Sequence, residues 1–313
     1  MQPGQGASVP DGHCHGMAKP LSLRGVHAEN ADRRRLPRKS WRGKAQRARP
    51  WARAARAGPP SPVGTILRIL VLNPNTSPEM TELVLRVLAP LTPADVELVP
   101  ATGRFGARYI SSRSAGAIAG HAALDAFAEH GAGCDAVYLA CFGDPGLMAL
   151  KEVAEIPVIG MAEAACRQAA LQGGRFSIVT GGERWGPILT EFTAALGLDG
   201  RLAAVETVAP TGGDIAADPD GSIALLADAC RRTVERDGAQ AVILGGAGLA
   251  GLAARVEPHV GVPVICSVQA GFAAVLDAAR NPPRKPLQGD LALPAAVPTI
   301  GLSAGLARLL GQR

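Results

Sequence analysis

The chain has 313 residues, of which 47% are hydrophobic and 19% charged, so it holds enough apolar material for one large or two modest α/β domains. No run of about 18 apolar residues free of charges occurs, which excludes a membrane-spanning helix. The six cysteines lie far apart, without the paired spacing of a zinc or redox site. This pattern predicts a cytoplasmic protein in a reducing compartment, with no metal.

Residues 1–64 differ in composition from the rest of the chain. Residues 1–60 contain 13 Lys or Arg and three Asp or Glu, a net charge of +10, and subtracting it from the chain's +5 leaves −5 for the remainder. The segment is rich in Pro and Gly and lacks an apolar period, so we expect a disordered basic extension. A targeting or nucleic-acid-binding arm is the alternative. The mildly acidic remainder is expected to bind neither nucleic acid nor membrane.

From residue 65 onward, short β-branched apolar runs alternate with longer, Ala-rich amphipathic stretches. The apolar runs predict strands at Ile69–Leu72, Val96–Val99, Ala136–Ala140, Val158–Gly160, Phe176–Thr180, Leu202–Val208, Ala241–Leu244 and Val262–Ile265. The amphipathic stretches predict helices at Pro78–Ala89, Ser114–Glu129, Pro145–Ala154, Glu163–Gln172, Pro187–Ala195, Ser222–Arg236, Leu249–Val256 and Gln269–Arg280. Strands that are apolar throughout are buried on both faces, so the predicted fold class is α/β with doubly wound parallel sheets.

An internal repeat divides this folded part into two lobes. Residues 135–165 match residues 240–271 at an offset of 105 that becomes 106 after one inserted residue. Two copies of one strand-turn-helix-strand unit predict a pseudo-symmetric pair of lobes, one formed by residues 65–161 with 268–313 and the other by 162–267. A ligand would bind in the cleft between the lobes, where the carboxyl ends of the strands face each other.

Cys141 is the first candidate for chemistry, because it follows a buried strand and precedes a Gly-rich turn. In that turn Asp144 has the residue type of a helix N-cap and Pro145 that of a first helical residue. The sulfur would then lie near a helix N-terminus, whose dipole lowers the pKa of a thiol. We therefore expect a reactive thiolate, with ordinary packing of a buried cysteine as the alternative.

Two further turns offer polar groups to a ligand. Asn75, Thr76 and Ser77 follow the first strand and precede a helix, and Thr180 precedes two glycines after the fifth strand. N-capping is the alternative role of the first group. Cys266 ends the last predicted strand and is a weaker candidate. No glycine-rich nucleotide motif opens a helix, which argues against a nucleotide cofactor.

Five strings in the same order resemble the aspartate/glutamate/hydantoin racemase superfamily, nearest its hydantoin and allantoin racemase branch: NPNTS, LACFGDPGL, PVIGMAEAA, FSIVTGG and LGGAGLAGL. In that family two cysteines, one from each lobe, transfer the α-proton of a small substrate on opposite faces, without cofactor. The resemblance, over about residues 66–305, implies Cys141 as the catalytic thiol. It also implies a set of substrate-binding residues around the thiol: Asn75, Thr76, Ser77, Phe142, Gly143, Thr180, Gly246 and Ala247.

The sequence departs from the family at the second cysteine, whose position is occupied by Gly246. We expect a racemase or epimerase of a small hydantoin or amino acid, with Cys266, water or another polar group acting on the second face. The alternatives are a single-cysteine decarboxylase or cis-trans isomerase of the same superfamily, and a ligand-binding relative without activity. The expected partner is a small-molecule substrate, and a homo-oligomer is left open.

Overall fold

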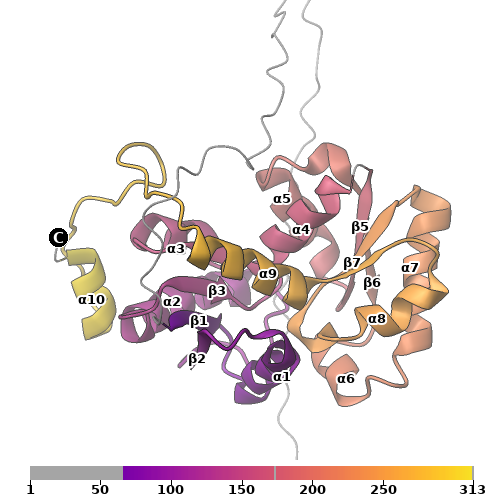
Figure 1. Cartoon of the computed structure of the whole chain (residues 1–313), viewed down its shortest axis with the longest axis horizontal. Helices are drawn as coiled ribbons and strands as arrows, with labels where there is room; N and C mark the ends of the chain where they lie inside the picture. The colour runs from indigo at the N-terminus through magenta and orange to yellow at the C-terminus, as the bar shows by residue number, and fades with distance from the viewer. Residues whose placement is uncertain (1–65, 173, 312–313) are drawn as a thin grey trace, which may run out of the picture. The chain divides into compact units, whose positions relative to one another are not determined.

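The computed structural model describes residues 66–172 and 174–311 (Figure 1). The predicted extension, residues 1–64, lies outside the described part of the chain. Within that part, none of the helices has the length and apolar character that crossing a bilayer requires.

The described residues form two parallel four-stranded sheets with the same strand order. The first sheet, in the order β2-β1-β3-β4, contains β1 (Leu67–Asn73), β2 (Val96–Thr102), β3 (Ala136–Leu139) and β4 (Val158–Gly160). The second, in the order β6-β5-β7-β8, contains β5 (Phe176–Gly181), β6 (Leu202–Val208), β7 (Ala241–Leu244) and β8 (Val264–Cys266). The predicted α/β class with parallel sheets is confirmed, and the shared order is the structural form of the repeat.

Helices cover both sheets. Their bounds are α1 (Pro78–Leu88), α2 (Arg113–His130), α3 (Leu147–Val153), α4 (Met161–Leu171), α5 (Trp185–Ala195), α6 (Gly212–Ala217), α7 (Ile223–Asp237), α8 (Ala253–Val256), α9 (Ser267–Arg280) and α10 (Ala304–Gly311). Short 3-10 turns lie at Ala89–Leu91, Asp199–Arg201, Ala247–Leu249 and Glu257–His259. The helix predicted at Leu249–Val256 is wrong: a 3-10 turn and the four-residue α8 occupy this region. Helices α6 and α10 were not predicted.

Two helices cross between the sheets. Helix α4 follows β4 of the first sheet but packs on β5, β7 and β8, whereas α9 follows β8 and packs on β1, β3 and β4 (Figure 1). The two crossing helices also pack against each other. We call each sheet with the helices packed on it a lobe. The lobe boundaries derived from the repeat, after residues 161 and 267, stay a prediction.

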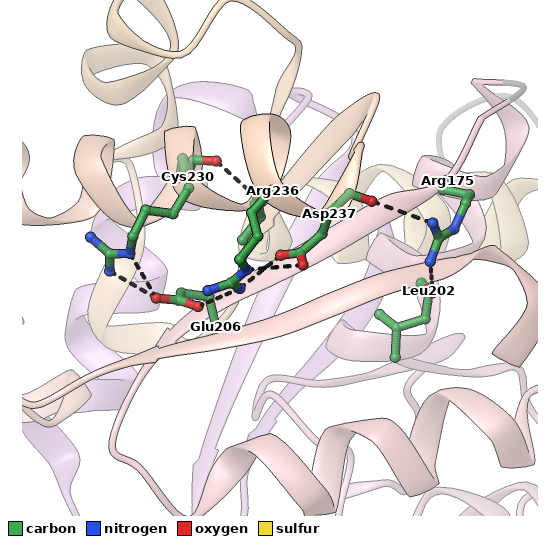
Figure 2. A network of polar contacts seen from close by, with 8 residues as sticks. Arg175, Leu202, Glu206, Cys230, Arg236 and Asp237 are labelled. Carbon is green, nitrogen blue, oxygen red and sulfur yellow. Dashed lines mark hydrogen bonds and ion pairs between the residues drawn. The ribbon is translucent and has the colours of Figure 1, made fainter.

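The central strands are fully buried, which explains their uninterrupted apolar sequence: all four residues of β3 and of β7 are buried. Away from the sheet ends, polar contacts fasten helix α7 to β6 (Figure 2). Glu206 accepts hydrogen bonds from Arg232 at 2.8 Å and Arg236 at 3.1 Å, and Arg236 also pairs with Asp237. This network is balanced in charge and is structural.

A candidate active site at the carboxyl ends of the strands

A pocket of about 50 Å³ is lined by turns that follow strands of both sheets. The first lobe contributes Asn75, Cys141 and Phe142, and the second contributes Thr180 and Gly246. This is the edge at which parallel α/β sheets bind their ligands. A shallower hollow of about 460 Å³ lies at residues 296–311, and none of the predicted site residues lines it.

Cys141 lies two residues beyond the end of β3 and is only 8% exposed. Burial raises the pKa of its thiol to about 12, and the nearby charge of Asp144 adds to the increase. The expected lowering of the pKa is therefore wrong. At neutral pH the thiol is therefore protonated.

The turn that follows Cys141 also differs from the prediction. Helix α3 begins after an N-cap at Gly146, which has a left-handed φ of 81°, so the prediction that Asp144 caps this helix is wrong. The carboxylate of Asp144 instead accepts the backbone N–H groups of Ala162 at 2.9 Å and Glu163 at 2.7 Å, in the first turn of α4. Burial nevertheless raises the pKa of Asp144 to about 7.

The turn after β1 contributes one residue to the pocket. Asn75 lines the pocket. Two hydrogen bonds fix its side chain, because its amide oxygen accepts the side-chain N–H of Asn73 at 2.8 Å and the backbone N–H of Ser77 at 2.9 Å. Ser77 is the N-cap of α1, with its hydroxyl accepting the N–H of Met80. Thr76 and Ser77 do not line the pocket.

On the opposite side, Thr180 donates a hydrogen bond of 2.7 Å to the carbonyl oxygen of Gly245. Gly246 follows, with φ 131° and ψ 145°, a backbone conformation that is essentially restricted to glycine. A Cβ built on Gly246 would lie 3.5 Å from Cδ1 of Leu249 and 3.9 Å from Oγ1 of Thr180. Position 246, where the family resemblance places the second cysteine, thus has space for a side chain, but its backbone conformation disfavours any residue except glycine.

No second thiol lines the pocket among the described residues. Cys134, Cys166, Cys230 and Cys266 are all buried elsewhere, and Cys14 lies outside the described part. Cys166 lies in α4 and Cys230 in α7. Cys266 ends β8 and does not line the pocket, and its role on the second face stays a prediction.

Two aromatic residues that sequence reasoning did not select close the pocket. The hydroxyl of Tyr109 donates to the carbonyl oxygen of Gly181 and accepts the N–H of Gly212, both at 3.2 Å. The ring of Trp185 lies against the Cys141 turn, because a Cβ built on Gly143 would come within 2.6 Å of its Cζ3. The sequence signal that could have identified them is their position at the ligand-binding edge, Tyr109 in the segment after β2 and Trp185 at the start of α5, the helix that follows β5.

The pocket is electrically neutral. None of the residues lining it has a charged side chain, and its polar side chains are those of Asn75, Tyr109, Cys141, Thr180 and Trp185. Among the described residues, no group of three or more His, Cys, Asp or Glu is placed to hold a metal ion. The arrangement can surround a small uncharged molecule and offer it the proton of Cys141.

Comparisons with known proteins match this geometry. The family model described as Asp/Glu/Hydantoin racemase matches residues 69–275. A hydantoin racemase of Pseudomonas sp. strain NS671 is 33% identical over 206 residues, covering 66% of this chain and 83% of the relative. A hydantoin racemase of Paenarthrobacter aurescens is 38% identical over 217 residues, which cover 65% of this chain and 87% of the relative. The structure of an allantoin racemase from Klebsiella pneumoniae matches with a TM-score of 0.69 and 33% sequence identity, and the match covers 75% of this chain and 96% of that protein.

Proposed function

Because the chain belongs to the Asp/Glu/hydantoin racemase family, in its hydantoin and allantoin racemase branch, we propose that it is a cofactor-independent racemase or epimerase of a hydantoin-type substrate. In this proposal Cys141 transfers the proton on one face of the substrate's α-carbon.

The observation that carries the substrate class is the neutral lining of the pocket that contains Cys141. A free amino acid brings a carboxylate and an ammonium group, and burying either without a charged partner is costly. A hydantoin holds the same α-carbon in an uncharged ring whose carbonyl and N–H groups need only hydrogen bonds. Asn75 and Thr180 are suited to such bonds. Of the two substrate types that the sequence left open, the pocket favours the hydantoin.

The protonated state of Cys141 sets its role in the reaction. A base on the opposite face removes the proton at C5, and the electron pair of that C–H bond delocalises onto the adjacent carbonyl. The S–H bond of Cys141 then breaks as its proton forms a new C5–H bond on the other face, which leaves a thiolate on Cys141 and one extra proton on the opposite base. The base releases its proton to solvent and the thiolate takes one up, which restores the starting form. The reverse reaction starts from the form before this exchange, in which the thiolate removes the C5 proton and the protonated base delivers one.

The second face of the substrate needs an acid or base, and among the described residues no second thiol lines the pocket to supply it. Gly246 has no side chain, and the hydroxyl of Thr180 is the polar group near the space beside it. We assign the second proton transfer to a water molecule or hydroxide ion in that space, in contact with Thr180. An unactivated water is a weaker base than a thiolate, so slower turnover than in a two-cysteine enzyme is expected.

The test is deuterium exchange in heavy water with three compounds that share one methyl substituent. 5-Methylhydantoin should incorporate deuterium at C5, seen by NMR, and lose optical purity on a chiral column, whereas alanine and methylmalonate should remain unchanged. Cys141→Ser should reduce exchange by about 100-fold or more, the usual contribution of a positioned acid or base.

Each other outcome contradicts a part of the proposal. Exchange of alanine would contradict the neutral-substrate argument, and decarboxylation of methylmalonate would favour the decarboxylase alternative. Full activity in Cys141→Ser would exclude the thiol. Binding of 5-methylhydantoin with no exchange would leave a ligand-binding relative.

A further inference from the structure

The segment between β2 and α2, residues 103–112, passes along the pocket, and we call it the strap. It belongs to the first lobe by its anchors. Arg104 pairs with the buried carboxylate of Asp125 in α2 at 2.7 Å, and the carbonyl oxygen of Ala107 accepts the N–H of Thr76 at 3.1 Å. The strap is therefore held at its start and near its middle by contacts within its own lobe.

Tyr109 connects the strap to the second lobe. Its hydroxyl lies between Gly181 at the end of β5 and Gly212 at the start of α6, donating to one and accepting from the other. A Cβ built on Gly182 would lie 3.5 Å from the same hydroxyl oxygen, so the hydroxyl lies against the backbone of glycine residues. Because one oxygen makes both bonds, replacing Tyr109 by Phe removes the two together and keeps the ring.

A second contact between the lobes serves as a reference. Arg113, just after the strap, forms a two-pronged ion pair with Glu191 of α5, with N–O distances of 2.5 and 2.6 Å. Both side chains are about 60% exposed or more. Exposed ion pairs contribute little, and neither residue lines the pocket. This pair therefore joins the same two lobes without touching the site.

The pocket is narrow in this arrangement. Its volume of about 50 Å³ is far below the several hundred Å³ typical of small-molecule sites, and Cys141 is 8% exposed. Substrate entry thus requires walls from the two lobes to separate. The lobes are joined away from the pocket by the packing of α4 on α9. Beside the pocket, Tyr109 is a side chain that bridges them.

We propose that Tyr109 is a positioning residue that holds the two lobes closed over the substrate and so controls access to Cys141. Opening breaks both hydrogen bonds of its hydroxyl, and closing restores them. The kinetic part of this inference rests on the proposed racemase function, whereas the accessibility of the thiol does not.

The first test measures accessibility in the full-length protein without substrate. Iodoacetamide at pH 9 alkylates Cys141, and mass spectrometry follows the peptide that carries it. Tyr109→Phe should raise the alkylation rate about tenfold, corresponding to about 1.4 kcal/mol for the two bonds. The matched control Glu191→Gln removes the exposed ion pair and should change the rate less than about twofold.

The second test is the kinetic split with 5-methylhydantoin. Tyr109→Phe should raise KM about tenfold and leave kcat within about twofold, because the complex still closes once substrate is bound. An unchanged alkylation rate and KM, with only a lower thermal midpoint, would make Tyr109 purely structural and overturn the proposal. An equal effect of Glu191→Gln would also overturn it. If wild-type protein shows no exchange, the proposed function fails while the alkylation comparison still decides the role of Tyr109.

Discussion

Asp144 and Cys141 share one tight turn, in which the N–H of Asp144 donates to the carbonyl oxygen of Cys141 at 3.0 Å. Burial raises the pKa of both side chains, that of the thiol to about 12 and that of the carboxyl to about 7. The charge of Asp144 adds to the increase at Cys141. The thiol of Cys141 is consequently neutral at physiological pH. Two predictions depend on this relationship.

The first prediction concerns the reactivity of Cys141 as a function of pH. A raised pKa means that the thiolate fraction grows tenfold for each pH unit until the pH approaches about 12. The rate of alkylation at Cys141 should therefore rise with unit slope between about pH 7 and pH 10. Mass spectrometry of the labelled peptide measures it, with Cys141→Ser as the unlabelled control. A plateau below pH 9 would mean that the thiol is activated.

The second prediction concerns stability and the carboxyl of Asp144. Its pKa is about 7 in the folded protein, against 3.8 for an unperturbed aspartate, so its contribution to stability is complete below about pH 3.8 and is lost as pH rises through about 7. This difference between the two pKa values corresponds to a change of at most about 4 kcal/mol in the free energy of unfolding. Urea unfolding of wild type and Asp144→Asn should show the wild-type free energy of unfolding falling relative to the variant from pH 5 to pH 8. A pH-independent difference would contradict the raised pKa.

The fold could be predicted from the sequence largely because its strands are buried on both faces. Runs such as Ala136–Leu139 are apolar throughout, and their repetition at Ala241–Leu244 indicates two similar lobes. Helix α6 could not be predicted in this way. It has six residues, two of them glycines, and depends on the capping box of Thr211 and Asp214 and on packing against the 3-10 turn at Ala247–Leu249.

The site could be predicted only where it follows from the end of a strand. Cys141, Thr180 and Gly246 lie within two residues of the end of a strand, and all three line the pocket. The raised pKa of Cys141 comes first from its burial by residues of the folded protein and then from the charge of Asp144. Local sequence specifies neither, because the Asp144 carboxylate is itself held by the N–H of Ala162, 18 residues along the chain. Tyr109 was missed for the same reason, since its hydroxyl bonds to a residue 72 positions away.

The third prediction concerns Gly246→Cys. From sequence alone a cysteine here could restore the second catalytic group, but φ 131° and ψ 145° oppose any side chain. We expect the variant to lose about 1–3 kcal/mol of stability and to gain no racemase activity. Gly246→Ala is the control, because it adds the same backbone strain without a thiol. Faster loss of optical activity of 5-methylhydantoin in Gly246→Cys than in wild type would show that the backbone adapts.

The fourth prediction concerns Trp185 as the residue that limits the substrate's substituent. The six-membered ring of the indole faces Gly143, with Cζ3 and Cη2 within 2.6 and 3.1 Å of a Cβ built there, and the five-membered ring faces Gly182. Only a small substituent fits beside Cys141 while the indole fills this space. Phenylalanine lacks the second ring, so Trp185→Phe should enlarge the pocket on the side of the thiol.

We therefore expect Trp185→Phe to raise the ratio of kcat/KM for 5-benzylhydantoin over 5-methylhydantoin by about tenfold, the low end of what a pocket-size change achieves. The ratio is insensitive to partial unfolding, because loss of folded enzyme lowers both values equally. Leu171→Ala, a change at an exposed side chain in α4, is the matched control and should leave the ratio unchanged. If both substrates lose activity in the same proportion in Trp185→Phe, then Trp185 supports the fold of the Cys141 turn and the substituent lies elsewhere.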